Sequence, residues 1–268
     1  MKVTVLSDNI SADGLRGEWG LSLWIEDGEN RILLDAGASP LFAENAKALG
    51  ITLDDATCAV LSHAHYDHAN GLETFFHANT HAKCYFRAGT APDCYGKKWI
   101  FRKYIGIPRT IQSSFRDRIE YADGNCQIAD GVYLIPHRLP NLERLGQINA
   151  LYRQKGRRLV PDGFAHEQSL VFNRDDGVVL FSSCSHAGAD AIAREVSVLF
   201  HKPVVCMIGG FHLFRRTDKD VLAIADGLHE VGVKKIYTGH CTGHHATELL
   251  CHRLDQAEEM HVGMTMEI

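Results

Sequence analysis

The sequence predicts an α/β protein in which short buried strands alternate with amphipathic helices. Apolar runs of strand length recur along the 268 residues, and several of them precede stretches with helical spacing. With 45% apolar and 23% charged residues, the chain can bury a substantial core as one large domain or two small ones. This composition excludes a disordered chain and a disulfide-stapled miniprotein.

Four strands are predicted in the first quarter of the chain. They are residues 2–6, 21–26, 31–34 and 58–61. The turn-rich segment Asp27-Gly28-Glu29-Asn30 joins the second strand to the third. A helix is expected over residues 40–49, where apolar side chains recur at helical spacing until Gly50 supplies a stop.

Later in the chain, strands and helices alternate. The predicted strands are residues 132–135, 169–172, 178–182, 204–208 and 235–237. Helices are expected over residues 189–200 and 218–231. Each of these helices follows a predicted strand, as an α/β arrangement requires.

A single domain over residues 1–268 is expected, with an irregular insertion around residues 90–165. No low-complexity linker and no repeat at a fixed period interrupts the sequence. The insertion is rich in basic residues, namely Lys97, Lys98, Arg102, Lys103, Arg109, Arg116, Arg118 and the run Arg153-Gln154-Lys155-Gly156-Arg157-Arg158. A solvated surface explains most of these charges. The alternative is a lid that binds an anionic substrate, because arginine suits phosphate and carboxylate groups.

The strongest chemical signal is a cluster of potential metal ligands directly after the strand at residues 58–61. The cluster is Ser62-His63-Ala64-His65-Tyr66-Asp67-His68. Strand alternation sends His63 and His65 to the same side, so both can bind one ion. As the chain turns into a helix, Asp67 and His68 can face a second ion. Imidazole combined with a carboxylate suits zinc, iron or manganese.

This cluster resembles the H-x-H-x-D-H signature of the metallo-β-lactamase superfamily, which lies at a strand-to-helix turn. Asp35-Ala36-Gly37 is similar to the superfamily's early Asp-x-Gly element, and the order of elements agrees along nearly the whole chain. The resemblance implies an αβ/βα sandwich of two mixed β-sheets flanked by helices, with a metal site along one edge. It does not identify the substrate, because one fold hosts many reactions.

Further metal ligands are expected where later strands end. His186 lies in a glycine-flanked loop after one predicted strand, and His240 follows another. A dinuclear site would then use His63, His65 and His186 for one ion, and Asp67, His68 and His240 for the other.

Two alternatives to this ligand set are open. Many superfamily hydrolases carry a histidine before a late strand, and His166 is the nearest candidate, although its surroundings lack the usual glycines. Cys184 stands near the position of a metal-bridging aspartate in the superfamily. We prefer His186 to His166, and we interpret Cys184 as a small buried thiol, the commoner state of free cysteine.

Separated motifs resemble one subgroup of the superfamily. They are Gly17-Glu18-Trp19-Gly20-Leu21-Ser22, Cys184-Ser185-His186-Ala187-Gly188, Gly209-Gly210-Phe211-His212-Leu213 and Gly239-His240-Cys241-Thr242-Gly243. This subgroup includes a 7,8-dihydropterin aminobenzene ribofuranosyl phosphate synthase of methanopterin biosynthesis, alongside many metal-dependent hydrolases. The resemblance therefore identifies a subgroup and leaves the reaction open.

The expected function is hydrolysis by a dinuclear metal centre that activates water. Two divalent transition metals are expected, with zinc favoured over iron or manganese. Asp67 would orient or deprotonate the water while binding its metal. His212 follows two glycines at a strand end, and its functional interpretation is a contact to the substrate or leaving group. The expected substrate is a small anionic phosphoester, thioester or lactone.

Other functions compete with hydrolysis. A transferase of the dihydropterin type would form a carbon–nitrogen bond and release pyrophosphate. A non-catalytic metal-binding or sensor protein would use the fold as a scaffold, but the intact ligand set argues against it. A nuclease is disfavoured, because the net charge is −5 and no nucleic-acid module is recognisable.

The expected compartment is the cytoplasm. The N-terminus lacks the apolar region of a secretory signal, and no apolar run approaches the length of a membrane-spanning helix. The eight cysteines are irregularly spaced, which favours reduced thiols. We therefore expect a soluble protein that acts on a small molecule, without a membrane partner and with nucleic acid disfavoured. The sequence does not indicate an oligomeric state.

Overall fold

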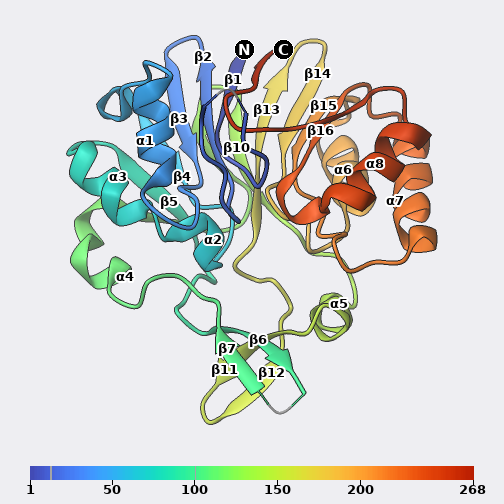
Figure 1. The fold of residues 1–268 in the computed structure, drawn as a ribbon, viewed down its shortest axis with the longest axis horizontal. Coiled ribbons are helices and arrows are strands. Elements are labelled where there is room, and N and C mark those ends of the chain that lie inside the picture. Colours follow the sequence, from blue (N-terminus) through green and yellow to red (C-terminus); the bar gives the residue numbers. More distant parts are fainter. Residues whose placement is uncertain (13, 100) are drawn as a thin grey trace. The chain divides into compact units, whose positions relative to one another are not determined.

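The computed structural model describes residues 1–12, 14–99 and 101–268, whose elements are drawn in Figure 1. The chain divides into two compact units. Unit 1 comprises Met1–Asp123, Asn141–Glu167 and His261–Ile268, and unit 2 comprises Gly124–Pro140 and Gln168–Met260. Both chain ends therefore belong to unit 1. The single domain stays a prediction.

Unit 1 is built on a mixed sheet of seven described strands. In spatial order they are β18 (Thr265–Glu267), β1 (Lys2–Ser7), β2 (Ser22–Asp27), β3 (Asn30–Leu34), β4 (Cys58–Val60), β5 (Lys83–Arg87) and β8 (Ile119–Ala122). β18, β1, β2 and β3 pair antiparallel, whereas β3, β4, β5 and β8 pair parallel. The carboxyl ends of the parallel strands share one edge of the sheet, where the loops after β3 and β4 meet.

A separate small sheet also belongs to unit 1. Its strands, in spatial order, are β12 (Arg158–Pro161), β11 (Leu151–Lys155), β6 (Cys94–Lys98) and β7 (Phe101–Tyr104). Figure 1 shows these strands grouped together, apart from the seven-stranded sheet. The sequence predicted an irregular insertion around residues 90–165. The structure instead places regular strands in this part of the chain. Pairing between residues 55 to 59 positions apart, such as Tyr95 and Tyr152, creates this order, and local sequence patterns do not specify such pairing.

Unit 2 contains a second mixed sheet of seven described strands. Its order is β17 (Ala257–Glu259), β16 (Ile236–Thr238), β15 (Val204–Gly209), β14 (Gly177–Phe181), β13 (Gln168–Arg174), β10 (Val132–Pro136) and β9 (Cys126–Ala129). β14, β15, β16 and β17 run parallel, and the rest pair antiparallel. The predicted α/β fold with mixed sheets and helices is confirmed.

Helices accompany both seven-stranded sheets. Unit 1 contains α1 (Leu41–Ala48), α2 (Tyr66–Ala69), α3 (Leu72–Ala78), α4 (Ile111–Ser114) and α5 (Leu142–Ile148), and unit 2 contains α6 (Ala189–Phe200), α7 (Asp218–Val231) and α8 (His244–Arg253). The predicted α7 has a clear local cause. The Thr217 side chain accepts the backbone N–H of Asp220, and the Asp220 side chain accepts the backbone N–H of Thr217, which forms a capping box. Gly232 ends the helix in the left-handed conformation. No described helix is both long and apolar enough to cross a membrane.

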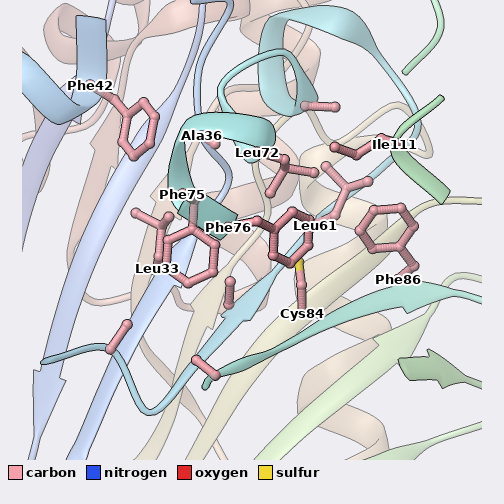
Figure 2. Close-up of a cluster of buried hydrophobic side chains, with 14 of the residues drawn as sticks. Leu33, Ala36, Phe42, Leu61, Leu72, Phe75, Phe76, Cys84, Phe86 and Ile111 are labelled. Carbon is pink, nitrogen blue, oxygen red and sulfur yellow. The ribbon is translucent and has the colours of Figure 1, made fainter. Parts of the chain in front are cut away.

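A core rich in aromatic residues lies next to the predicted metal-ligand segment of unit 1. Figure 2 shows Phe75 and Phe76 of α3 packed with Leu61 and Phe86, and Phe42 of α1 belongs to the same cluster. Leu61, Phe75 and Phe86 are fully buried. Close packing of buried side chains resists movement of the neighbouring backbone. The core therefore gives the segment directly after Leu61 a rigid base.

Candidate metal centre

The predicted ligand segment follows β4 and includes the first residues of α2, and we call it the histidine turn (residues 62–68). His63, His65, Asp67 and His68 are all buried. The ring centroid of His63 lies 4.6 Å from that of His65 and 4.2 Å from that of His68. The structure thus gathers three imidazoles from the turn at one place in unit 1.

Backbone hydrogen bonds hold the turn against the loops around it. The N–H of Ala36 donates to the carbonyl of His68 at 2.8 Å, and the N–H of Leu21 donates to the carbonyl of Asp67 at 3.2 Å. A Cβ on Gly71 would lie 2.0 Å from the carbonyl oxygen of Ala36, so only glycine allows this approach. The turn is therefore a fixed part of the sheet edge.

Asp35 organises the imidazoles through a hydrogen-bond network. Its carboxylate accepts the N–H of Ser62 at 2.8 Å and the hydroxyl of Ser62 at 2.7 Å. It also lies 2.8 Å from Nδ1 of His68. The Ser62 hydroxyl, having donated to Asp35, accepts Nδ1–H of His63 at 2.8 Å. Both rings then carry their proton on Nδ1, and Nε2 of each is the atom suited to a metal ion.

The charges around His68 act in opposite directions on its protonation. Burial lowers the pKa of His68, but the carboxylates of Asp35, Asp67 and Glu167 raise it, and the net pKa lies above its usual value. Glu167 is itself buried beside this group, immediately before β13. Sequence reasoning missed Glu167. Its only local signal is a carboxylate that directly precedes an apolar strand.

Asp67 has a second anchor that the sequence did not indicate. Nε1–H of Trp19 donates to Oδ2 of Asp67 at 2.9 Å, across 48 residues of sequence. The preceding residue, Glu18, accepts the backbone N–H of Ala38 at 3.1 Å and the hydroxyl of Ser39. The segment around Trp19 thus orients a candidate ligand and closes the loop after Asp35.

His166 lies close to the histidine turn, but its hydrogen bonds oppose a role as ligand. The N–H of Ala64 donates to its Nδ1 at 3.1 Å, and its Nε2 lies 2.9 Å from the carboxylate of Asp162. An acceptor Nδ1 requires the proton on Nε2, where it is donated to Asp162. A histidine bound through Nε2 would instead need its proton on Nδ1.

His65, Cys94, Asp162 and His166 are close enough together to hold an ion, with all ligand atoms within 4.8 Å of one another. The proton positions nevertheless favour a hydrogen-bonded support. Burial raises the pKa of Asp162, but His166, the N–H of Phe164 and Arg153 lower it, and the net pKa lies below its usual range. The carboxylate therefore stays ionised as the acceptor for His166.

Unit 2 contributes its histidines from the ends of three parallel strands. His186 follows β14, His212 follows β15 and His240 follows β16. His186 and His240 are buried, and His212 is half-buried. The rings of His186 and His212 are 4.6 Å apart between centroids. Parallel strands end on the same side of the sheet, so the three loops share one edge of unit 2.

Backbone strain marks each of these loops. Ser185, His212 and His240 have φ values of 49°, 51° and 48°, in the left-handed region that non-glycine residues rarely occupy. Strained residues persist only where the surroundings hold them, and they concentrate at functional sites. The three loops therefore have the character of a site.

Two cysteines pack between these loops. The ligand atoms of Cys184, His212 and Cys241 all lie within 4.8 Å of one another. Sγ of Cys241 accepts the backbone N–H of His212 at 3.3 Å. A Cβ on Gly210 would come within 2.5 Å of that sulfur, so the glycine makes room for the thiol. The burial of Cys184 agrees with its interpretation as a buried thiol.

Comparisons with known proteins agree with this description. The model of the metallo-β-lactamase superfamily matches residues 19–255. The chain is 28% identical to the 7,8-dihydropterin-6-methyl-4-(β-D-ribofuranosyl)-aminobenzene-5′-phosphate synthase of Methanocaldococcus jannaschii, over 91% of this chain and 88% of that protein. It is 25% identical to an uncharacterised protein of the same organism, MJ0448, over 99% of this chain and all of that protein.

A solved structure shows the same fold. Tm1679, described as a metal-dependent hydrolase of the β-lactamase superfamily, is 25% identical to this chain and superimposes with a TM-score of 0.84. The superposition covers all of this chain and 99% of Tm1679. The resemblance that the motifs indicated is thereby confirmed.

Proposed function

The chain belongs to the metallo-β-lactamase superfamily, and we propose that it is a hydrolase. It has the same fold as a metal-dependent hydrolase of that superfamily. The proposed reaction is hydrolysis of a small anionic substrate at a dinuclear metal centre. The proposed ligands are His63, His65 and His186 for the first ion, and Asp67, His68 and His240 for the second. Zinc is the favoured metal, because imidazole nitrogens dominate this set, and iron or manganese also suits it.

The observation that carries this proposal is the proton arrangement in the histidine turn. Asp35 and Ser62 hold the Nδ1 protons of His68 and His63, which presents Nε2 of both rings for coordination. Such outer partners are typical of metal-binding histidines, whose orientation and basicity they set. Packing alone would not require Asp35 to bind His68 directly and His63 through the Ser62 hydroxyl.

Metal ions held by these residues would lower the pKa of a bound water and polarise the scissile group of the substrate. The chain's own residues supply orientation and proton transfer. Asp67, which accepts the Nε1–H of Trp19, would orient the attacking water and accept its proton. His212 is assigned to contact the substrate or its leaving group, because it stands on a strained strand-end loop beside His186. Phosphoesters, thioesters and lactones are the proposed substrate classes.

The ligand assignment can be tested by metal analysis of paired variants. The His63→Ala/His65→Ala double variant should lose the first ion, and His186→Ala should lose metal and activity together. His166→Asn is the matched control, because its amide oxygen can still accept the Ala64 N–H, and it should keep most of its metal. Unchanged metal content in His186→Ala, with loss in His166→Asn, would reverse the assignment.

A transferase is the second candidate, and the named Methanocaldococcus relative favours it. In that case an organic nucleophile would replace water, and pyrophosphate would leave. Turnover in oxygen-18 water separates the two reactions. Hydrolysis should place one labelled oxygen in the product per turnover. A requirement for a second organic substrate, with no label incorporated, would establish transfer.

A further inference from the structure

The four-stranded sheet of unit 1 has an unusual charge. Its hairpins, residues 94–104 and 151–161, contain eight lysines and arginines and no aspartate or glutamate, although the whole chain has a net charge of −5. Only Arg153 among these cations has an ion-pair partner within the described residues, namely Asp93. The sheet therefore presents positive charge that the protein itself leaves uncompensated.

Strand register gathers aromatic rings and cations on one face of this sheet. Tyr95 is paired with both Tyr104 and Tyr152, and Lys97 is paired with Arg102. Directly opposed residues, and residues two apart along a strand, share a face. We call this surface the tyrosine face, and it comprises Tyr95, Tyr104, Tyr152, Lys97, Arg102 and the adjoining Arg109.

Each tyrosine of this face is accompanied by a cation. Arg109 lies 4.2 Å from the ring centroid of Tyr104, within the range of a cation–π contact. Lys97 lies 5.5 Å from the ring of Tyr152, and Arg102 lies 5.8 Å from the ring of Tyr95. The rings are partly exposed and the cations exposed. Aromatic surface and positive charge thus occur together, open to solvent.

The tyrosine face is connected directly to the histidine turn. β7 continues into Ile105, whose carbonyl accepts the N–H of Tyr66 at 2.9 Å, and Gly106 forms a β-bridge with His65. A Cβ on Gly106 would come within 2.8 Å of the phenol oxygen of Tyr104, so the Tyr104 side chain packs directly against the backbone that pairs with His65. A molecule on the face would be held by a strand that leads into the proposed metal ligands.

We propose that the tyrosine face binds the substrate as an anion carrying a planar aromatic ring, of the aryl phosphate class. The rings of Tyr95 and Tyr152 stack on the aromatic part, and Arg102 and Arg109 bind the phosphate through their guanidinium groups. This inference rests on the proposed function, because it names the substrate class of that same centre. Burial raises the pKa of Tyr104 to about 12, so its phenol stays uncharged beside the anion.

The test measures binding of phenyl phosphate to the full-length, metal-depleted protein by titration calorimetry. Metal depletion separates this face from the metal centre. The Arg102→Ala/Arg109→Ala variant should bind at least about tenfold more weakly than wild type, the loss expected for charge-assisted bonds. Lys98→Ala/Lys155→Ala is the matched control, because it removes the same charge from the opposite face of the sheet, and its affinity should stay within about twofold of wild type.

Two further probes test the aromatic part and the class of ligand. Methyl phosphate should bind at least about fivefold more weakly than phenyl phosphate to wild type, and Tyr152→Leu should reduce that difference, because only the Tyr95 ring is then left to stack on the phenyl group. Equal losses in the face variant and its control, or equal affinity for both phosphates, would overturn the proposal. So would binding of single-stranded oligouridine that is far tighter than phenyl phosphate binding and depends on Arg102 and Arg109, because the face would then bind nucleic acid.

These outcomes are distinguishable from failure of the proposed function. The face variants should keep the metal content of wild type, whereas ligand variants of the histidine turn should lose metal and still bind phenyl phosphate. In the metal-loaded protein, with bis(4-nitrophenyl) phosphate as substrate, Arg102→Ala/Arg109→Ala should raise KM and leave kcat nearly unchanged. An unchanged KM would contradict the proposal even if hydrolysis is established.

Discussion

Asp35 shows how one buried side chain can orient candidate metal ligands through hydrogen bonds. It accepts three hydrogen bonds, two from Ser62 and one from His68, from a fully buried position. Its own backbone is left-handed, with a φ of 60°. A non-glycine residue holds such a conformation only when the surroundings stabilise it. These three bonds contribute to that stabilisation, together with the backbone N–H of Asp35 donating to Val60 and its carbonyl accepting from Ser22.

Asp35→Asn should therefore weaken metal binding more than its small change in shape suggests. The amide retains one acceptor oxygen and adds a donor that would face the Nδ1–H of His68 or the donors of Ser62. We expect about a 10- to 100-fold loss of zinc affinity. An unpaired buried donor should lower the free energy of unfolding by about 1–3 kcal/mol. Competitive zinc titration and urea unfolding measure the two effects.

Asp176→Asn is the control for this substitution, because Asp176 is exposed in the turn between β13 and β14. It should leave zinc affinity unchanged and shift the free energy of unfolding by less than about 0.5 kcal/mol. Wild-type zinc affinity in Asp35→Asn would show that the network does not set the ligand protons.

At the scale of elements, the ends of β14, β15 and β16 determine where His186, His212 and His240 lie in unit 2. These strands end in loops that touch one another through glycines. A Cβ on Gly209 would lie 2.1 Å from the carbonyl oxygen of Ser182, and one on Gly210 would lie 2.8 Å from that of Ser183. The close approach is what brings the loop of His212 beside the loop of His186.

Gly210→Ala should separate these loops. The added methyl group would lie 2.5 Å from Sγ of Cys241 and 2.8 Å from the carbonyl oxygen of Ser183. Relieving the second clash requires the backbone at Ser183 to move, which costs more than rotating a side chain. We expect a loss of about 1–3 kcal/mol in the free energy of unfolding, together with weaker metal binding. Gly96→Ala is the comparison, since its Cβ would meet nothing closer than 3.6 Å. Denaturant melts of both variants decide the matter, and equal stability would refute the packing account.

For the whole molecule, the proposed ligand set makes metal binding a source of stability. The ligands come from segments as far apart as His63 and His240, which the unfolded chain does not hold together. A metal that binds only the folded state shifts the unfolding equilibrium by mass action. Stability should therefore depend on metal concentration.

Zinc should raise the free energy of unfolding by about 2.7 kcal/mol per site when its free concentration is roughly 100 times Kd. Chelation should reverse this gain, and the melting temperature should fall accordingly. The His63→Ala/His65→Ala variant should show a smaller response, because it lacks the first site. Calorimetric scans with and without chelator test this, and a melting temperature that ignores zinc in wild type would contradict a structural contribution from the metal.

Local patterns in the sequence determined much of the fold and the identity of the chemistry. Apolar periodicity depends only on neighbouring residues, and it correctly predicted β1 to β4 and the helices α6 and α7 within a residue or two. The histidine turn was also recognisable, because four potential ligands follow one buried strand. Family membership followed from these motifs and is confirmed.

Tertiary structure alone decided which residues support the candidate ligands. Asp35 meets His68 across 33 residues, Trp19 meets Asp67 across 48, and His166 meets Ala64 across 102. No local period encodes these contacts, since they depend on which strands become neighbours in a sheet. The same holds for the small sheet, where β6 pairs with β11. Periodicity and motifs depend on neighbouring residues and can be recognised in the sequence, whereas hydrogen bonds between distant segments exist only after the chain has folded.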